Sequence, residues 1–149
     1  MKSLLYAEDL IHSLLRLEEL GRIMVIHSFK TAKKVLFGRG ALKQLGREAK
    51  EMGARRTAVI TDHGIRRAGI VDRVTEVLER EKIEYGVWEE VESEPALDVG
   101  EAAIQFVREG RYDSVIGLGG GSSLDAAKAA AASITNTGTL KDWVKAPFQ

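Results

Sequence analysis

The chain has 149 residues, of which 44% are hydrophobic and 30% are charged, proportions typical of a folded globular protein rather than a disordered one. Lysine plus arginine total 22 and aspartate plus glutamate total 22, so the net charge of zero gives no support for a nucleic-acid or membrane partner. The absence of cysteine excludes disulfides, thiolate metal sites and cysteine nucleophiles. No apolar run approaches the roughly 20 residues of a membrane helix, and no signal-peptide pattern is present, so we expect a cytoplasmic protein.

Residues 1–28 are predicted to form an N-terminal extension. Leucine and isoleucine recur at helical spacing within residues 1–21, with charged side chains on the other face, which predicts an amphipathic helix that ends near Gly21. Two interpretations stay open, a surface helix packed on its own domain and a helix that binds a partner or forms a dimer. Met24 is also a candidate translation start, which would place this segment outside the protein.

Residues 29–149 are predicted to form a single α/β domain. Strands are expected at residues 33–37, 57–61, 85–88 and 114–118. Helices are expected at residues 41–52, 65–81, 99–108, 123–134 and 140–144, with a turn at 62–64 and an acidic loop at 89–95. The strand at 57–61 is an apolar run without alternation, which is typical of a strand buried on both faces. Alternating strands and helices favour a Rossmann-like parallel sheet with helices on both faces.

The strongest candidate for a binding site is the stretch 116–128. A predicted strand runs directly into Gly119-Gly120-Gly121-Ser122, and a helix follows at once. Glycines let a ligand approach the main chain, and a helix N-terminus offers N–H groups and a positive dipole end to a phosphate. The spacing matches neither the G-x-G-x-x-G dinucleotide fingerprint nor a Walker A loop. From these residues alone, a phosphate site and a tight connection are equally good interpretations.

The polar residues of this stretch also have a structural interpretation. Ser122 and Asp125 stand three apart, as an N-cap and its capping-box partner would. Asp125 and Lys128 are spaced for a weak ion pair on the helix. The helix is otherwise thin enough to pack closely on its neighbours, because it contains Ala126, Ala127, Ala129, Ala130, Ala131 and Ala132.

The pattern Gly119-Gly120-Gly121-Ser122-x-x-Asp125-x-x-Lys128 resembles the signature of the iron-containing alcohol dehydrogenase family. Three further pieces stand in the family's order, namely Phe37-Gly38-Arg39-Gly40-Ala41-Leu42, Val59-Ile60-Thr61-Asp62 and Thr135-Asn136. The resemblance covers about residues 29–145. It implies the N-terminal nucleotide-binding domain of an NAD(P)-dependent enzyme that transfers hydride between a small alcohol or aldehyde and nicotinamide.

The resemblance also assigns the cofactor-binding residues. It implies that the pyrophosphate is held at Gly119, Gly120, Gly121 and Ser122, and that Asp125 and Lys128 line the cofactor side of an interdomain cleft. Asp62 is expected to accept hydrogen bonds from both ribose hydroxyls, and its charge would repel a 2′-phosphate, so NAD is favoured over NADP. The alternative for Asp62 is an ordinary turn residue ahead of Gly64.

One departure from the family lies in the acidic loop. Family members often have Asn-Pro-Thr there, whereas this chain has Glu94-Pro95-Ala96, which removes an asparagine expected near the nucleotide. The glutamate further disfavours a phosphorylated ribose.

The other departure concerns the metal. In the family, Fe²⁺ or another divalent metal is held by an aspartate and three histidines of a C-terminal helical domain that this sequence lacks. His12, His27 and His63 match none of those positions and are interpreted as surface or turn histidines. We therefore expect no metal ligand, no catalytic residue and no dehydrogenase activity from this chain alone.

The chain is accordingly expected to be the N-terminal part of such an enzyme, as a fragment, a truncated gene product or one half of a split protein. Its expected partners are the dinucleotide and either a second copy of the chain or a complementing C-terminal half. Two alternatives stay open: a non-catalytic nucleotide-binding module left by truncation, and a relative of the glycerol dehydrogenases or dehydroquinate synthases.

Overall fold

The computed structural model describes residues 34–92 and 97–145, so the helix predicted at 1–21 lies outside the described residues. The chain divides into two compact units, Met1–Leu36 and Phe37–Gln149, and every helix and strand given below belongs to the second. Within the two described ranges, no helix has the length and apolar character needed to cross a bilayer.

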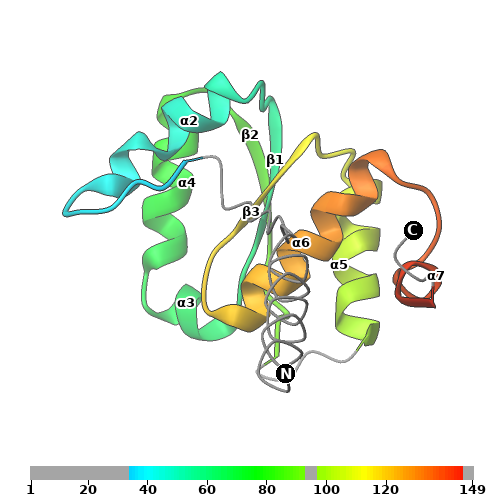
Figure 1. Cartoon of the computed structure of the whole chain (residues 1–149). Helices are drawn as coiled ribbons and strands as arrows, with labels where there is room; N and C mark the ends of the chain where they lie inside the picture. The colour runs from blue at the N-terminus through cyan, green and yellow to red at the C-terminus, as the bar shows by residue number, and fades with distance from the viewer. Residues whose placement is uncertain (1–33, 93–96, 146–149) are drawn as a thin grey trace, which may run out of the picture. The chain divides into compact units, whose positions relative to one another are not determined.

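A parallel sheet of three strands lies at the centre of the second unit (Figure 1). The strands are β1 (Arg56–Ile60), β2 (Glu84–Trp88) and β3 (Ser114–Gly117), in the order β2-β1-β3. Ile60, the last residue of β1, pairs with Trp88 on one side and Gly117 on the other, so all three strands end at the same edge. The central strand is buried from Thr57 onwards, as its uninterrupted apolar run predicted.

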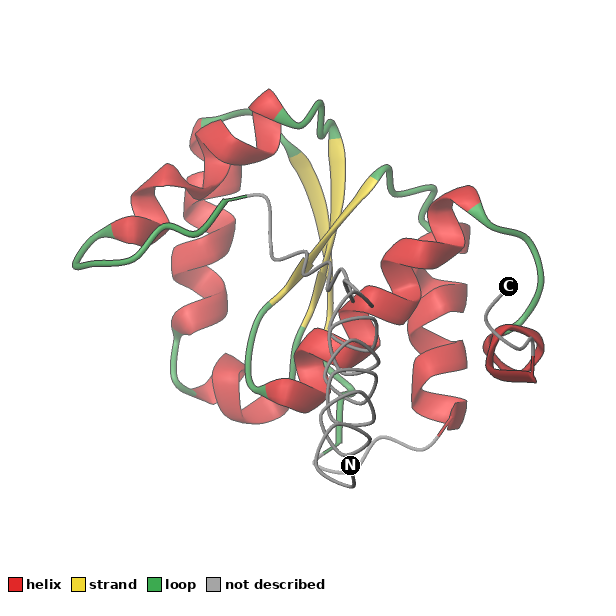
Figure 2. Ribbon diagram, viewed as in Figure 1, coloured by secondary structure: helices red, strands yellow, loops and turns green. Residues whose placement is uncertain are grey.

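Helices cover both faces of this sheet (Figure 2). The helices of the described residues are the 3₁₀ helix η1 (Ala41–Gln44) and the α-helices α2 (Leu45–Glu51), α3 (His63–Arg67), α4 (Ile70–Arg80), α5 (Leu97–Glu109), α6 (Gly121–Thr135) and α7 (Leu140–Lys145), of which α7 packs on α5. Alternate residues of β1 face opposite layers: Ala58 and Ile60 pack with α5 and α6, whereas Val59 packs with α2 and α4. The predicted Rossmann-like α/β fold is therefore confirmed.

Three predictions of secondary structure were wrong. Residues 34–37, the described part of the strand predicted at 33–37, form no strand, and the Phe37 side chain is fully exposed with no sheet to pack on. The helix predicted at 65–81 is divided into α3 and α4 by Gly69, whose φ of 69° is left-handed and ends the first helix. The turn predicted at 62–64 is instead the start of α3, with Asp62 as its N-cap.

Small residues let α6 pack closely on the sheet, as the alanine-rich sequence predicted. Ala126, Ala127 and Ala130 are buried in the core shared with α5. A Cβ added to Gly117, at the end of β3, would lie only 2.8 Å from the Ala127 Cβ. Glycine in β3 and alanine in α6 therefore set how near this helix approaches the strand.

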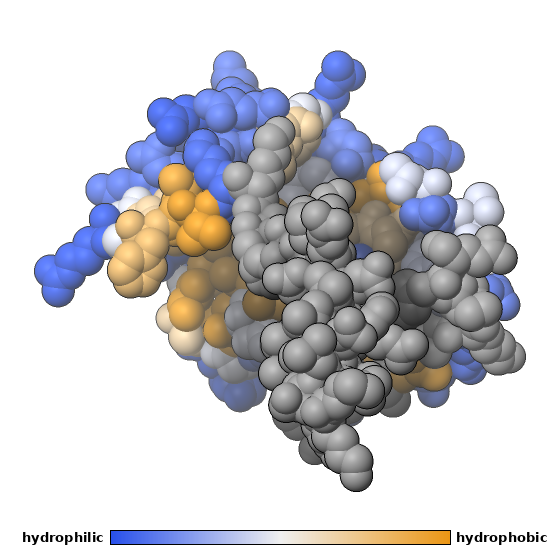
Figure 3. Space-filling model, in the orientation of Figure 1, coloured by the Kyte–Doolittle hydropathy of each residue, from blue (hydrophilic) through white to orange (hydrophobic). Residues whose placement is uncertain are grey.

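On the face drawn in Figure 3, hydrophilic residues lie along the upper edge and hydrophobic residues gather left of the centre. The exposed hydrophobic side chains include Phe37, Met52 and Leu124. Leu124 lies in the first turn of α6 and is 43% exposed, so an apolar side chain borders the loop that contains the three glycines.

Candidate functional site

The loops that follow β1 and β3 meet at the carboxyl edge of the sheet. From β1 the chain crosses to β2 on one side, and from β2 it returns to β3 on the other side of β1. The two crossovers use opposite faces of the sheet, since α4 packs on one face and α5 on the other. This reversal of strand order is where open α/β sheets bind their ligands. Asp62 follows β1 and Gly119 follows β3, so two predicted site residues flank that point.

The three glycines after β3 differ in what the fold requires of them. Gly119 has a φ of 145°, and a Cβ there would lie 2.5 Å from the Ser123 Oγ. Gly120 has a φ of −81° and a ψ of −166°, which other residues adopt readily. A Cβ on Gly120 or Gly121 would meet no atom within 4 Å. The fold therefore requires glycine at position 119 only, and it leaves the main chain uncovered at the next two positions.

Helix α6 begins inside the glycine loop. Gly121 is its first residue, and its N-cap, Gly120, has no side chain to cap the helix. The prediction that Ser122 is the N-cap was wrong, because Ser122 lies within the first turn, and Asp125 is then not placed to complete a capping box. No acidic residue occupies the first turn of this 15-residue helix. The positive end of its dipole thus faces the loop, an arrangement that favours an anion.

Asp62 links the loops after β1 and β3. Its Oδ1 accepts a hydrogen bond from the Ile65 N–H at 3.0 Å, and its Oδ2 accepts one from the Ser123 hydroxyl at 3.1 Å. The Ile65 N–H is the largest cause that holds the pKa of the Asp62 carboxyl below its ordinary value of 3.8, against an opposing effect of burial. Asp62 therefore caps α3 as an ionised carboxylate, and its Oδ2, which accepts from Ser123 alone, keeps a lone pair for a ligand.

Thr61 and Ser123 also belong to the site, although neither was predicted from the sequence as a site residue. The Thr61 hydroxyl, fully buried, donates to the Leu118 carbonyl at 2.7 Å. Together with the Asp62–Ser123 bond, this contact holds the glycine loop at both ends. Thr61 and Leu118 are separated by 57 positions in the sequence, and Asp62 and Ser123 by 61, so only the pairing of the strands brings them together. The one feature of the sequence that could have indicated Thr61 and Ser123 is that they stand next to the predicted site residues Asp62 and Ser122.

Asp125 and Lys128 lie on the solvent-exposed side of α6. The Lys128 Nζ lies 2.9 Å from the Asp125 Oδ1, and the two side chains are 76% and 70% exposed. The predicted ion pair on the helix is confirmed. Both side chains are free to reorient toward a ligand or a further domain, because exposed pairs of this kind contribute little to stability.

A hollow of about 290 Å³ opens beside Asp62, between the loops that follow β1 and β2. It is lined by Asp62, His63, Gly64, Arg67, Val91 and Glu92. The guanidinium of Arg67 is close enough to contribute to the lowered pKa of Asp62. The hollow therefore extends the candidate site from the glycine loop toward β2.

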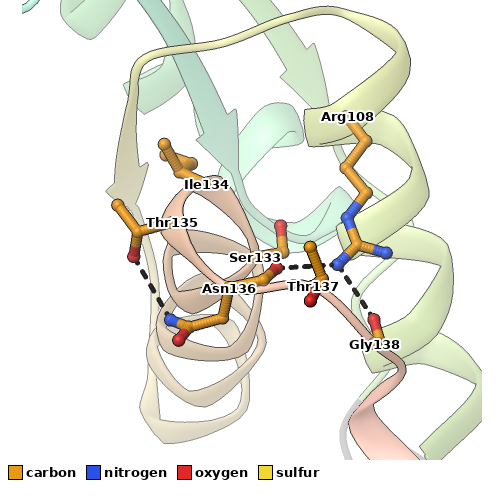
Figure 4. A pocket seen from close by; sticks show the side chains of 7 residues that line it. All are labelled: Arg108, Ser133, Ile134, Thr135, Asn136, Thr137 and Gly138. Carbon is orange, nitrogen blue, oxygen red and sulfur yellow. Dashed lines mark hydrogen bonds between the residues drawn. The ribbon is translucent and has the colours of Figure 1, made fainter.

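A second hollow, also of about 290 Å³, lies at the far end of α6 (Figure 4). Its lining comprises Arg108 and residues 133–138, and Arg108 donates to the carbonyls of Asn136 and Gly138 at 3.1 and 2.9 Å. A helix of 15 residues is roughly 22 Å long, which separates this hollow from the glycine loop. It is not part of the candidate site.

Residues 34–92 and 97–145 hold no group of three or more histidine, cysteine, aspartate or glutamate side chains that could bind a metal ion. His63 lies 3.9 Å from a Glu89 oxygen and 3.5 Å from a Glu90 oxygen, and Glu89 is already bound to Arg66. That bond to Arg66 is the main cause of a lowered Glu89 pKa. The described residues therefore do not fit an iron ion, whereas His12, His27 and residues 94–96 lie outside them.

Comparison with known proteins identifies the family. The family described as iron-containing alcohol dehydrogenase matches residues 32–148. The chain belongs to this family. The resemblance inferred from the glycine motif and the three ordered pieces of sequence is thereby confirmed.

Two curated relatives share a third or more of their residues with this chain where they align. Long-chain-alcohol dehydrogenase 1 of Geobacillus thermodenitrificans is 45% identical over 72% of the chain, which covers 27% of that protein. NADH-dependent butanol dehydrogenase A of Clostridium acetobutylicum is 34% identical over 83% of the chain and 32% of that protein. The chain thus spans about a third of the length of the curated relatives that it matches.

Solved structures show the same fold. The crystal structure of NADH-dependent butanol dehydrogenase A from Thermotoga maritima superposes with a TM-score of 0.73 at 32% identity, covering 80% of this chain and 30% of that one. An iron-containing alcohol dehydrogenase from the same organism gives a TM-score of 0.70 at 28% identity, over 80% of this chain and 34% of that one. Both similarities support the assignment to the family.

Proposed function

We propose that this chain is the cofactor-binding part of an NAD-dependent, metal-dependent alcohol dehydrogenase. The observation that carries the proposal is the uncovered main chain at Gly120 and Gly121. The fold does not need glycine at either position, and both lie at the N-terminus of a long helix at the reversal of strand order. A pyrophosphate that rests against the backbone does need glycine at these two positions.

Each predicted residue receives a role in this proposal. Backbone N–H groups at positions 119–121 and the hydroxyl of Ser122 bind the pyrophosphate, while Asp62 accepts from the ribose hydroxyls. The hollow beside Asp62 has room for the adenosine end. The Asp62 carboxylate is ionised and would repel a 2′-phosphate, which favours NAD. Two relatives named as NADH-dependent butanol dehydrogenases are consistent with that preference.

Asp125 and Lys128 are assigned to the edge of the cofactor cleft. Their exposure on α6 supports a surface role that does not disturb the fold. The bound cofactor supplies the hydride chemistry, and this chain contributes its placement. Because the described residues offer no metal-binding group, we propose that a second polypeptide region supplies the metal and that the chain alone does not turn over alcohols.

The test is a calorimetric titration of the chain with NAD and with NADP, repeated on Asp62→Asn. Asparagine keeps the N-cap of α3 but removes the charge, so the preference for NAD is expected to fall by about tenfold or more. Asp113→Asn is the matched control, because Asp113 also accepts from backbone N–H groups, those of Arg55 and Arg56, at the opposite edge of the sheet. It should leave both affinities unchanged. Equal affinity of the unaltered chain for NAD and NADP would remove the proposed role of Asp62.

A second measurement concerns catalysis. We expect the purified chain to show no alcohol-dependent reduction of NAD, and activity to return when a helical metal-binding domain from a relative is added. Turnover by the chain alone would contradict the first expectation. Nucleotide binding without any restored activity would favour the alternative of a non-catalytic nucleotide-binding module.

A further inference from the structure

Ser123 is a buried side chain that no established role of the glycine motif explains. It is 1% exposed, it lies one residue beyond Ser122 in the first turn of α6, and its hydroxyl donates to the Asp62 Oδ2 at 3.1 Å. Burying a hydroxyl is costly unless it is hydrogen-bonded, and a carboxylate acceptor makes the bond charge-assisted and strong. A residue of α6 is thus bound to the carboxylate at the end of β1.

Gly119 packs directly against this pair. A Cβ on Gly119 would lie 2.5 Å from the Ser123 Oγ, 2.9 Å from its Cβ and 3.0 Å from the Asp62 Oδ2. The absence of a side chain at position 119 is therefore what lets the hydroxyl and the carboxylate meet beneath the loop.

We propose that Ser123 is a positioning residue for the dinucleotide: it fixes the Asp62 carboxylate to α6, so that the group that binds the ribose keeps a constant separation from the loop that binds the pyrophosphate. The inference rests on the proposed function in assigning Asp62 to the ribose. With Oδ1 held by the Ile65 N–H and Oδ2 by Ser123, the carboxylate cannot rotate. Its remaining lone pairs then point in fixed directions, which reduces the ordering that the nucleotide must impose on binding.

A fixed carboxylate also gives selectivity. While Ser123 holds it, the negative charge stays where a 2′-phosphate would lie. Without the hydroxyl, Asp62 keeps only the backbone N–H contacts at the start of α3, those of Ile65 and Gly64, and its Oδ2 can turn away from an added phosphate. Loss of the Ser123 hydroxyl should therefore weaken NAD binding while it weakens NADP binding less or not at all.

The first experiment needs no nucleotide. Carboxyl ¹³C NMR titration of the free chain measures the Asp62 pKa in the wild type and in Ser123→Ala. The Ser123 hydroxyl is one of the groups that lower this pKa, so the pKa is expected to rise in the variant. Ser133→Ala is the matched control, since Ser133 is a buried serine of the same helix whose hydroxyl bonds the Ala130 carbonyl instead. An Asp62 pKa that is the same in Ser123→Ala and the wild type overturns the inference.

The second experiment measures the dissociation constants of NAD and NADP for the same variants. In Ser123→Ala the NAD affinity is expected to fall about three- to tenfold, with a smaller change for NADP, and Ser133→Ala should change neither. A purely structural role of Ser123 would lower the melting temperature and affect both nucleotides equally, and that result would refute the proposal.

A double variant then tests whether Ser123 acts through Asp62. In the Asp62→Asn background, Ser123→Ala should cause no further change in the NAD-to-NADP ratio, and a full additional effect would contradict the proposal. If the wild-type chain binds neither nucleotide, the proposed function fails, and the nucleotide part of this inference fails with it. A changed ratio without a changed Asp62 pKa would leave the proposed function intact and refute the role of Ser123.

Discussion

Alanine at position 120 should weaken nucleotide binding and leave the fold stable, whereas alanine at position 119 should destabilise the fold itself. At Gly120, a φ of −81° and open space around the missing Cβ allow alanine without strain. The substitution should change the stability of the fold by less than about 1 kcal/mol, because the restriction that alanine places on the unfolded chain is offset by the poorer N-cap that alanine makes. At Gly119, a φ of 145° costs a residue with a Cβ about 1–3 kcal/mol. Overlap with the Ser123 Oγ adds to that cost.

Thermal unfolding followed by circular dichroism measures the stability, and calorimetric titration with NAD measures the binding. Each kcal/mol should shift the melting temperature by about 2–8 °C for a chain of this size. Gly120→Ala should melt close to the wild-type temperature yet bind NAD at least about tenfold more weakly, because its methyl group occupies the surface on which the pyrophosphate rests. Gly119→Ala should melt several degrees lower, since the strain lies in the fold itself.

Gly53→Ala separates strain from binding. Gly53 ends α2 with a φ of 86° and open space around its missing Cβ, so alanine there meets strain without overlap and away from the site. It should lower the melting temperature and leave the NAD affinity unchanged. The reasoning would be refuted by a Gly120→Ala chain that is fully folded and binds NAD as tightly as the wild type, because the uncovered main chain would then have no use.

Two further predictions concern the packing and charge of the same region. Gly117→Ala should destabilise the chain by about 1–3 kcal/mol through overlap with the Ala127 Cβ, and adding Ala127→Gly should recover part of the loss in chemical denaturation. The lowered pKa of Asp62 contributes stability that is present above its unfolded value of 3.8 and is lost as the pH falls through the folded value. The unfolding free energy of Asp62→Asn should therefore fall less than that of the wild type between about pH 5 and about pH 2. An equal fall in the unfolding free energy of the two chains would contradict this.

The sequence predicted local structure well where the side-chain pattern of one segment reflects how that segment is buried. The buried central strand followed from the run Thr57–Thr61, and the close approach of α6 followed from its alanines. Pattern alone failed where a glycine changes the backbone direction. The apolar spacing of residues 65–81 continues through Gly69, so only its left-handed φ reveals two helices.

The sequence by itself determined the parallel α/β fold, the family and the order glycine loop then helix, because these depend on the periodicity and spacing of residues near one another in the chain. It left Ser122 and Asp62 each with a structural and a binding interpretation. Only the tertiary structure showed that Gly120, not Ser122, is the N-cap of α6, and that Asp62 both caps α3 and binds Ser123. The physical reason is that the pairing of β1 with β3 brings together residues that are about sixty positions apart in the sequence. The pattern of neighbouring residues does not indicate a contact between such distant positions.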